Sequence, residues 1–286
     1  MNEVKGVLIP IGGNEDKGQE ESENYTLEFI EEGILSQVVK EAGGPDSSIV
    51  IIPTASSIPD EVSKGYLEAF SKLGCSNLEI LDIRDRKQSE EKRSLSLLEQ
   101  ADCVMFSGGN QSKIVDFIGG TRAHQILSDR YQNESFVIAG TSAGAMCMST
   151  EMVAGGSAAD SLIKGAVKMR KGMGFVSGLI IDTHFIKRGR FGRLMEAMAI
   201  HPHLLGLGLA EDTGIIIRDG NDFEVIGSGM VMLFDPGKLE HNSYELLPKG
   251  TPISMSNMIV HILAQSDHFT IDNRKIAISP LEMGIE

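Results

Sequence analysis

The most informative segment of this sequence is Phe136-Val137-Ile138-Ala139-Gly140-Thr141-Ser142-Ala143-Gly144. Its apolar first half predicts a buried strand, and the small residues that follow Ser142, up to Met148, predict a helix. A glycine on each side of Ser142 lets the backbone turn sharply between the two elements without a Cβ clash. A strand, a tight turn centred on a serine and a helix form a nucleophile elbow, which exposes the serine hydroxyl above a sheet edge. The segment therefore predicts a serine-nucleophile hydrolase.

The first half of the chain alternates apolar runs with amphipathic segments. We expect strands at 7–11, 48–52, 78–81, 104–106 and 136–139, and helices at 25–41, 60–73, 111–118 and 122–131. This alternation is typical of an α/β fold in which helices cover both faces of a mainly parallel sheet. The stretch 14–24 is acidic and polar, so we expect a mobile surface loop there.

The pattern changes after Ser149. A short strand at 179–182 and a helix at 191–199 precede closely spaced strands at 214–217, 223–226 and 230–234. We expect these strands to extend the sheet with antiparallel members toward the C-terminus, and the part 243–278 is also strand-like. No linker, repeat or low-complexity segment interrupts the chain, so we expect a single domain over residues 1–286.

Composition restricts the class of protein. The 286 residues carry a net charge of −14, which argues against a nucleic-acid partner because no basic stripe is available to neutralise phosphates. No apolar run approaches the ~18 residues that span a bilayer, and the N-terminus lacks a signal-peptide pattern, so we expect no membrane partner. Three widely spaced cysteines, Cys75, Cys103 and Cys147, indicate buried reduced thiols in a cytoplasmic protein.

A serine nucleophile needs a general base, and His184 is the best-placed histidine. It follows the strand that ends at Asp182 and therefore lies at a carboxyl end, where sites assemble in parallel α/β sheets. Glu211 follows another strand and is the candidate for orienting the imidazole, although Asp212 beside it would serve equally well. The chain order Ser, His, Glu differs from the Ser, acid, His order of α/β-hydrolases, so an ordinary esterase or lipase is disfavoured.

Alternatives to this triad exist at each position. A histidine that follows a strand is more often structural than catalytic. Cys147 lies five residues beyond Ser142 and is a second candidate nucleophile, but its neighbours Met146 and Met148 indicate a packed helix face, and we interpret it as core.

The segment Ser107-Gly108-Gly109-Asn110-Gln111 ends another strand just before a helix. Acyl transfer needs two N–H donors for the oxyanion, one of them commonly from the residue after the nucleophile. Here Ala143 would supply that donor and Gly109 the other, with Gln111 facing the cleft. The alternative is a glycine-rich strand-to-helix turn of the kind that any α/β fold contains.

Three arginines, Arg188, Arg190 and Arg193, crowd the segment after His184. In an acidic protein they suggest capture of carboxylates through bidentate hydrogen bonds. The alternative is a solvated helix face paired with acidic neighbours such as Glu196.

Two further patterns are weak. The segment 12–18 resembles a phosphate loop but lacks the Gly-Lys-Ser/Thr ending and carries two acids, so nucleotide binding is not expected. His201-Pro202-His203 has no companion ligand at metal spacing. We expect neither a metal nor another cofactor.

Taken together, the motifs resemble those of cyanophycinases over about three quarters of the chain, from 12 to 217. Five motifs occur in the family's order: Gly12-Gly13-Asn14-Glu15-Asp16-Lys17, Ser107 to Gln111, Gly140 to Ala145, Asp182-Thr183-His184-Phe185 with the three arginines, and Glu211-Asp212-Thr213.

The resemblance implies a serine peptidase related to α-aspartyl dipeptidases, on a flavodoxin-like fold similar to the class I glutamine amidotransferase domain. It implies an exopeptidase that hydrolyses cyanophycin (multi-L-arginyl-poly-L-aspartate) to β-Asp-Arg dipeptides through an acyl-enzyme. Ser142, His184 and Glu211 match the nucleophile, the base and its partner. The positions associated with the substrate pocket are Gln111, Asp182, Thr183, Arg188, Arg190 and Arg193. Arginines would hold carboxyl groups there and Asp182 a cationic or amide end. The family is commonly dimeric, so we expect a homodimer.

Two residues depart from the family pattern. Thr183 stands where cyanophycinases usually have glutamine, and Asn110 where they usually have aspartate. A threonine is shorter and offers a hydroxyl instead of an amide, so one pocket contact must change while the triad is unaffected. The alternatives are an aspartyl or isoaspartyl dipeptidase that acts on small Asp-containing peptides, and a binding homologue that has lost catalysis.

Overall fold

Two large β-sheets form the framework of the protein, which a computed structural model describes at residues 4–18, 27–156 and 160–279. The larger sheet has nine strands in the order β17-β16-β11-β10-β1-β5-β4-β2-β3. Its parallel core consists of β1 (Val7–Ile11), β5 (Val137–Thr141), β4 (Cys103–Phe106), β2 (Ile49–Ile52) and β3 (Leu78–Ile80). These strands read as short, almost uninterrupted apolar runs because helices cover both faces.

The two helical layers bury alternate residues of the same strands. Ile9 packs in a cluster with residues of α1 (Ile34–Glu41) and α2 (Pro59–Lys72). Its neighbour Leu8 points to the opposite face, toward residues of α3, α4, α5 and α6. These helices are α3 (Lys92–Gln100), α4 (Gln111–Phe117), α5 (Arg122–Asn133) and α6 (Ala143–Met146). The predicted parallel α/β core with helices on both faces is confirmed.

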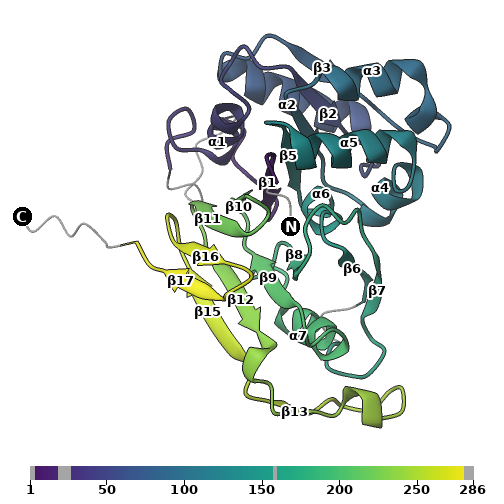
Figure 1. Cartoon of the computed structure of the whole chain (residues 1–286), viewed down its shortest axis with the longest axis vertical. Coiled ribbons are helices and arrows are strands. Elements are labelled where there is room, and N and C mark those ends of the chain that lie inside the picture. The colour runs from purple at the N-terminus through teal and green to yellow at the C-terminus, as the bar shows by residue number, and fades with distance from the viewer. Residues whose placement is uncertain (1–3, 19–26, 157–159, 280–286) are drawn as a thin grey trace, which may run out of the picture.

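The other side of the nine-stranded sheet is antiparallel. β10 (Thr213–Arg218) pairs with β1, and β11 (Asp222–Gly227), β16 (His268–Thr270) and β17 (Lys275–Ala277) follow outward. Figure 1 shows these C-terminal strands on the side of β1 away from β2 and β3. The predicted antiparallel strands toward the C-terminus are therefore confirmed for 214–217 and 223–226.

The second sheet has four strands in the order β15-β12-β9-β8. They are β15 (Ile259–Leu263), β12 (Val231–Asp235), β9 (Leu205–Leu209) and β8 (Leu179–Asp182), with α7 (Phe191–Ile200) packed against them below the parallel core in Figure 1. The expectation that 230–234 extends the main sheet is wrong. The chain leaves one sheet at Gly227, whose φ is +96°, and β12 pairs instead with β9 and β15, a choice that local sequence does not encode.

Smaller elements complete the described chain. A hairpin of β6 (Glu151–Gly155) and β7 (Lys168–Lys171) lies beside β8, and β13 (His241–Asn242) pairs with β14 (Met255–Ser256). Three 3₁₀ turns span Gln88–Glu90, Pro236–Lys238 and Tyr244–Leu246. Within the described ranges, no helix is long and apolar enough to cross a membrane.

The helix expected at 25–41 begins only at Ile34. Gly33 has an extended backbone and precedes it, and residues 29–32 form a turn. Residues 25 and 26 lie outside the described ranges, as does the 19–24 part of the expected acidic loop. Within its described part, Glu15 is buried with an exposed fraction of 3%, so the expectation of a surface loop is wrong for that residue.

Candidate active site

Ser142 stands at the sharp turn between β5 and α6. Its φ of 51° and ψ of −108° lie outside the regions that L-residues ordinarily occupy, a strain that is typical of functional turns. A Cβ on Gly144 would lie 2.6 Å from the Phe106 carbonyl oxygen, so a glycine is required where α6 approaches β4. The Ser142 N–H donates to the Ile11 carbonyl at 2.9 Å and fixes the turn to the end of β1.

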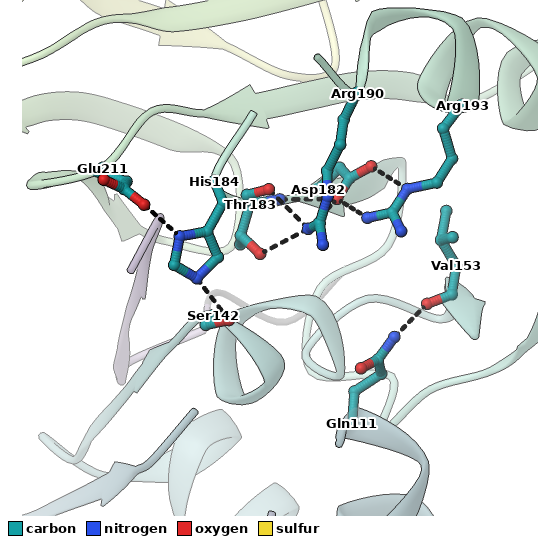
Figure 2. Close-up of polar contacts among 9 residues, drawn as sticks. All are labelled: Gln111, Ser142, Val153, Asp182, Thr183, His184, Arg190, Arg193 and Glu211. Atoms are coloured by element: carbon teal, nitrogen blue, oxygen red, sulfur yellow. Dashed lines mark hydrogen bonds and ion pairs between the residues drawn. The ribbon is translucent and has the colours of Figure 1, made fainter. Parts of the chain in front are cut away.

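Ser142, His184 and Glu211 form a hydrogen-bonded line (Figure 2). Nδ1 of His184 lies 2.8 Å from Oε1 of Glu211, and Nε2 lies 3.1 Å from Oγ of Ser142. Because an ionised carboxylate only accepts hydrogen bonds, Nδ1 carries the proton and Nε2 is free to accept from the serine hydroxyl.

The line joins the two sheets. Ser142 follows β5 of the nine-stranded sheet, whereas His184 and Glu211 follow β8 and β9 of the four-stranded sheet. β8 and β9 are parallel neighbours with Asp182 opposite Gly208, so their carboxyl ends lie side by side and bring His184 next to Glu211. His184 itself has a φ of 46°, and its N–H donates to the Gly12 carbonyl at 2.8 Å.

The surroundings favour a neutral imidazole beside an ionised carboxylate. Burial lowers the pKa of His184, and the nearby Arg188 and Arg190 lower it further, which together outweigh the raising effect of Glu211. Burial would raise the pKa of Glu211, but hydrogen bonds from His184 and Lys187 outweigh it and lower the pKa. Lys187, whose Nζ lies 3.1 Å from Oε2 of Glu211, is a contact that the sequence interpretation missed.

A pocket of about 600 Å³ opens beside Ser142 and His184. This volume falls in the usual range of small-molecule and peptide sites. Its walls carry charges of both signs, with Glu61, Lys64 and Glu68 on α2 and with Glu15, Lys17 and Arg188 from other segments. The lining residues are Gly13, Asn14, Glu15, Lys17, Glu61, Val62, Lys64, Gly65, Tyr66, Glu68, Gly108, Gly109, Thr141, Ser142, His184 and Arg188.

The two N–H groups predicted for an oxyanion lie near Ser142. Ala143 is the first residue of α6, where helical N–H groups have no partner within the helix. Gly109 lines the pocket, and a Cβ at its neighbour Gly108 would lie 3.4 Å from Cβ of Ser142. In the described part of the chain, neither Ala143 nor Gly109 donates its N–H to a backbone carbonyl.

Two of the predicted substrate arginines contact Asp182 instead of lining this pocket (Figure 2). Arg193 makes two hydrogen bonds to the carboxylate, with Nε 2.8 Å from Oδ2 and Nη2 close to Oδ1. Arg190 donates to Oδ1 at 3.1 Å and to the Thr183 carbonyl at 2.7 Å. Asp182 is fully buried, whereas Arg188 is exposed and lines the pocket.

Gln111 and the two departures from the family pattern have local partners. Nε2 of Gln111 donates to the Val153 carbonyl at 2.7 Å. Asn110 caps α4 by accepting from the Ser112 N–H at 2.9 Å, a role that asparagine and aspartate perform about equally well. Thr183 is fully buried, and its carbonyl accepts a hydrogen bond from Arg190.

The alternative nucleophile and the weak metal pattern lie elsewhere. Cys147 is completely buried, as the core interpretation requires, and burial raises the pKa of its thiol to about 12. The rings of His201 and His203 are 6.0 Å apart, and among the described residues no group of three or more His, Cys, Asp or Glu side chains could hold a metal ion.

An α/β fold in which an elbow serine is hydrogen-bonded to a histidine, and that histidine to a carboxylate, is the arrangement of a serine hydrolase. The chain belongs to peptidase family S51, whose family profile matches residues 19–225. It is similar to the cyanophycinase of Trichormus variabilis (strain ATCC 29413 / PCC 7937), with 34% identity over 275 residues that cover 96% of this chain and 88% of the relative. The cyanophycinase of Geminocystis herdmanii (strain PCC 6308) is 33% identical over 274 residues, 95% of each chain.

A solved structure supports the fold. The crystal structure of a peptidase from an acI-B1 Actinobacterium superposes with a TM-score of 0.59 at 20% identity, covering 91% of this chain and 99% of that chain. At this identity the likeness establishes the α/β architecture alone.

Proposed function

We propose that this S51 peptidase uses Ser142 as its nucleophile, His184 as its general base and acid, and Glu211 as the group that orients the imidazole. The observation that carries the proposal is the line of hydrogen bonds, 3.1 Å from Ser142 to His184 and 2.8 Å from His184 to Glu211. The lowered pKa of His184 supports it, because a base must be neutral to take a proton at neutral pH.

In the proposed mechanism, Oγ of Ser142 attacks the scissile carbonyl carbon while Nε2 of His184 takes the hydroxyl proton. The oxyanion accepts hydrogen bonds from the N–H groups of Gly109 and Ala143. The C–N bond then breaks as His184 returns its proton to the leaving amine, which leaves an ester on Ser142. Water attacks this ester with His184 again as base, and the acid product leaves as the proton returns to Ser142.

We propose cyanophycin as the substrate, with β-Asp-Arg dipeptides as the product. The two relatives named as cyanophycinases support this assignment, since their similarity extends over nearly the whole chain. A pocket lined by both cations, such as Arg188, and acids, such as Glu61 and Glu68, suits a peptide that bears carboxylates and guanidinium groups. Arg188 is the arginine best placed for a substrate carboxylate. For Arg190, Arg193, Asp182, Thr183 and Gln111, a role in substrate binding remains part of the proposal and requires that substrate join or replace their present partners.

The second candidate is a dipeptidase for small aspartyl or isoaspartyl peptides. The observation that favours it is the Asp182 cluster, in which the carboxylate is already paired with both Arg190 and Arg193. A homodimer also remains a proposal that rests on the family resemblance, and light scattering of the purified chain checks it.

Mass spectrometry of the products from purified cyanophycin tests the substrate. We expect β-Asp-Arg from the wild type and no product from Ser142→Ala. Cleavage of free Asp-X peptides without release of dipeptides from the polymer would favour the dipeptidase. A fluorophosphonate probe should label the wild type and not Ser142→Ala; absent labelling of both would favour a binding protein without catalysis.

A further inference from the structure

The loop that follows β1, residues 12–17, contacts the triad although none of its residues belongs to it. Its backbone and that of Ile11 accept hydrogen bonds from Ser142, from His184 and from the residue after Glu211. Three carbonyls accept these hydrogen bonds: Ile11 from the Ser142 N–H at 2.9 Å, Gly12 from the His184 N–H at 2.8 Å, and Gly13 from the Asp212 N–H at 3.0 Å. Because the triad spans two sheets, this loop is the common support on which the two halves meet.

The loop also fits closely against the imidazole. Gly13 has a φ of +105°, and a Cβ at this position would lie 2.4 Å from Cε1 and 2.5 Å from Nε2 of His184. On the other side, the Asp16 N–H donates to Oδ1 of Asp212 at 3.0 Å. The 12–17 loop therefore restricts the histidine sterically and holds the residue after Glu211 by hydrogen bonds.

Glu15 connects this loop to the nucleophile elbow. Its side chain is 1% exposed, and each oxygen has a defined partner. Oε2 accepts from the Thr141 hydroxyl at 2.6 Å, and Thr141 directly precedes Ser142. Oε1 accepts from the Tyr66 hydroxyl and from Nζ of Lys17, which lies 2.8 Å away. One carboxylate thus joins the 12–17 loop, the elbow and the pocket wall formed by α2.

The carboxylate is ionised in this setting. Burial opposes ionisation, but Lys17 and the hydroxyls of Thr141 and Tyr66 outweigh it and lower the pKa of Glu15. An ionised acid that receives three donors cannot be replaced by an amide without loss, because a glutamine offers a single acceptor oxygen.

We propose that Glu15 is a positioning residue for the serine chemistry. It acts through Thr141, which it holds so that the Ser142 hydroxyl points at Nε2 of His184. Its link to Tyr66 keeps the α2 wall of the pocket at a constant distance from the nucleophile. The proposal rests on the proposed function, in which Ser142 is the nucleophile.

The test is the rate constant of fluorophosphonate labelling per folded molecule, measured for Glu15→Gln. We expect it to fall about 10- to 100-fold, since a small misplacement of a reacting group costs this much. With a cleaved peptide substrate, kcat should fall by the same factor while KM changes less than about twofold. The isosteric Thr141→Val, which removes the linking hydroxyl, should give a similar loss, and the double variant should lose little more than either single variant.

Glu196→Gln is the matched control. Glu196 is also a fully buried glutamate, and it accepts from the N–H groups of Gly165 and Val167 at 3.0 and 3.1 Å, apart from the Ser142 pocket. The Glu196→Gln variant measures the effect of losing a buried carboxylate that has no link to Ser142. Its labelling rate constant per folded molecule should therefore stay within about twofold of the wild-type value.

The outcomes separate the two proposals. Absent labelling of the wild type refutes the proposed function, and the inference with it. A reactive wild type whose rate is unchanged in Glu15→Gln, or multiplicative losses in the double variant, refutes the inference alone. If Glu15→Gln does not fold, Thr141→Val decides the question on the same scale.

Discussion

Replacing Asp182 with asparagine separates a structural from a substrate-binding role for the most deeply buried ion cluster of the site. The carboxylate is fully buried, accepts two hydrogen bonds from Arg193 and is approached by Arg190 at 3.1 Å. Arg193 is itself 6% exposed, so the substitution removes the carboxylate that pairs with this buried charge. Removing one partner of such a pair costs about 3–5 kcal/mol.

This cost should be visible in the free energy of unfolding measured with urea. For a chain of this size it corresponds to a fall in Tm of roughly 6–20 °C, taking about 2–4 °C for each kcal/mol. The matched control is Asp116→Asn, because Asp116 pairs with Arg170 at 2.7 Å on the exposed surface. That pair should contribute about 0–1 kcal/mol.

The result that would refute this reasoning is equally specific. If the free energy of unfolding of Asp182→Asn lies within about 1 kcal/mol of the wild-type value while kcat/KM for the peptide falls strongly, the carboxylate binds substrate and does not stabilise the fold. If Asp182→Asn is less stable and adding Arg193→Met partly restores its free energy of unfolding, the structural role is supported, since replacing both partners removes the unpaired charge.

Three further predictions concern the triad and its turn. In a pH–rate profile, the acid limb of kcat/KM should have its midpoint below the ordinary histidine pKa of 6.5, because burial, and then Arg188 and Arg190, lower the pKa of His184. In Arg188→Gln this midpoint should rise. A wild-type midpoint above 6.5 would contradict the prediction. Gly144→Ala places a Cβ 2.6 Å from the Phe106 carbonyl, so we expect about 1–3 kcal/mol of destabilisation by urea unfolding together with loss of probe labelling; normal stability and labelling would show that the elbow can relax. Lys187→Ala removes an exposed contact to Glu211 that the His184 bond does not need, so steady-state kcat/KM should fall less than about threefold, and a hundredfold loss would make Lys187 part of the machinery.

The parallel core could be predicted from sequence because each of its strands is a short apolar run, a signal that lies within five residues. The second sheet could not be predicted as such. β12 is recognised from sequence as a short strand, as β10 and β11 are, and only its pairing with β9 and β15 places it in another layer. Pairing is a non-local choice that periodicity does not contain.

The site shows the same division. The elbow around Ser142 is local. His184 and Glu211 were suggested by their places after two strands and by the order of the motifs, and the parallel pairing of β8 and β9 explains why they lie close together. The partners of Asp182 and the burial of Glu15 were not predictable. Glu15 lies in an acidic stretch that suggests solvent, and it is buried because Tyr66 and Thr141, 51 and 126 residues away, converge on it.

The division of the proposed triad between two layers has a consequence for how the enzyme loses activity on heating. Met146, at the base of the Ser142 helix, packs in one cluster with Ile180 and Phe185 of the layer that carries His184. A small shift of one layer against the other at this cluster would separate Oγ of Ser142 from Nε2 of His184, while each layer kept its own hydrogen bonds. In the proposed mechanism, the rate of probe labelling at Ser142 should therefore fall on warming before the circular dichroism of the protein changes. Probe labelling would then report early on how tightly the two layers pack together.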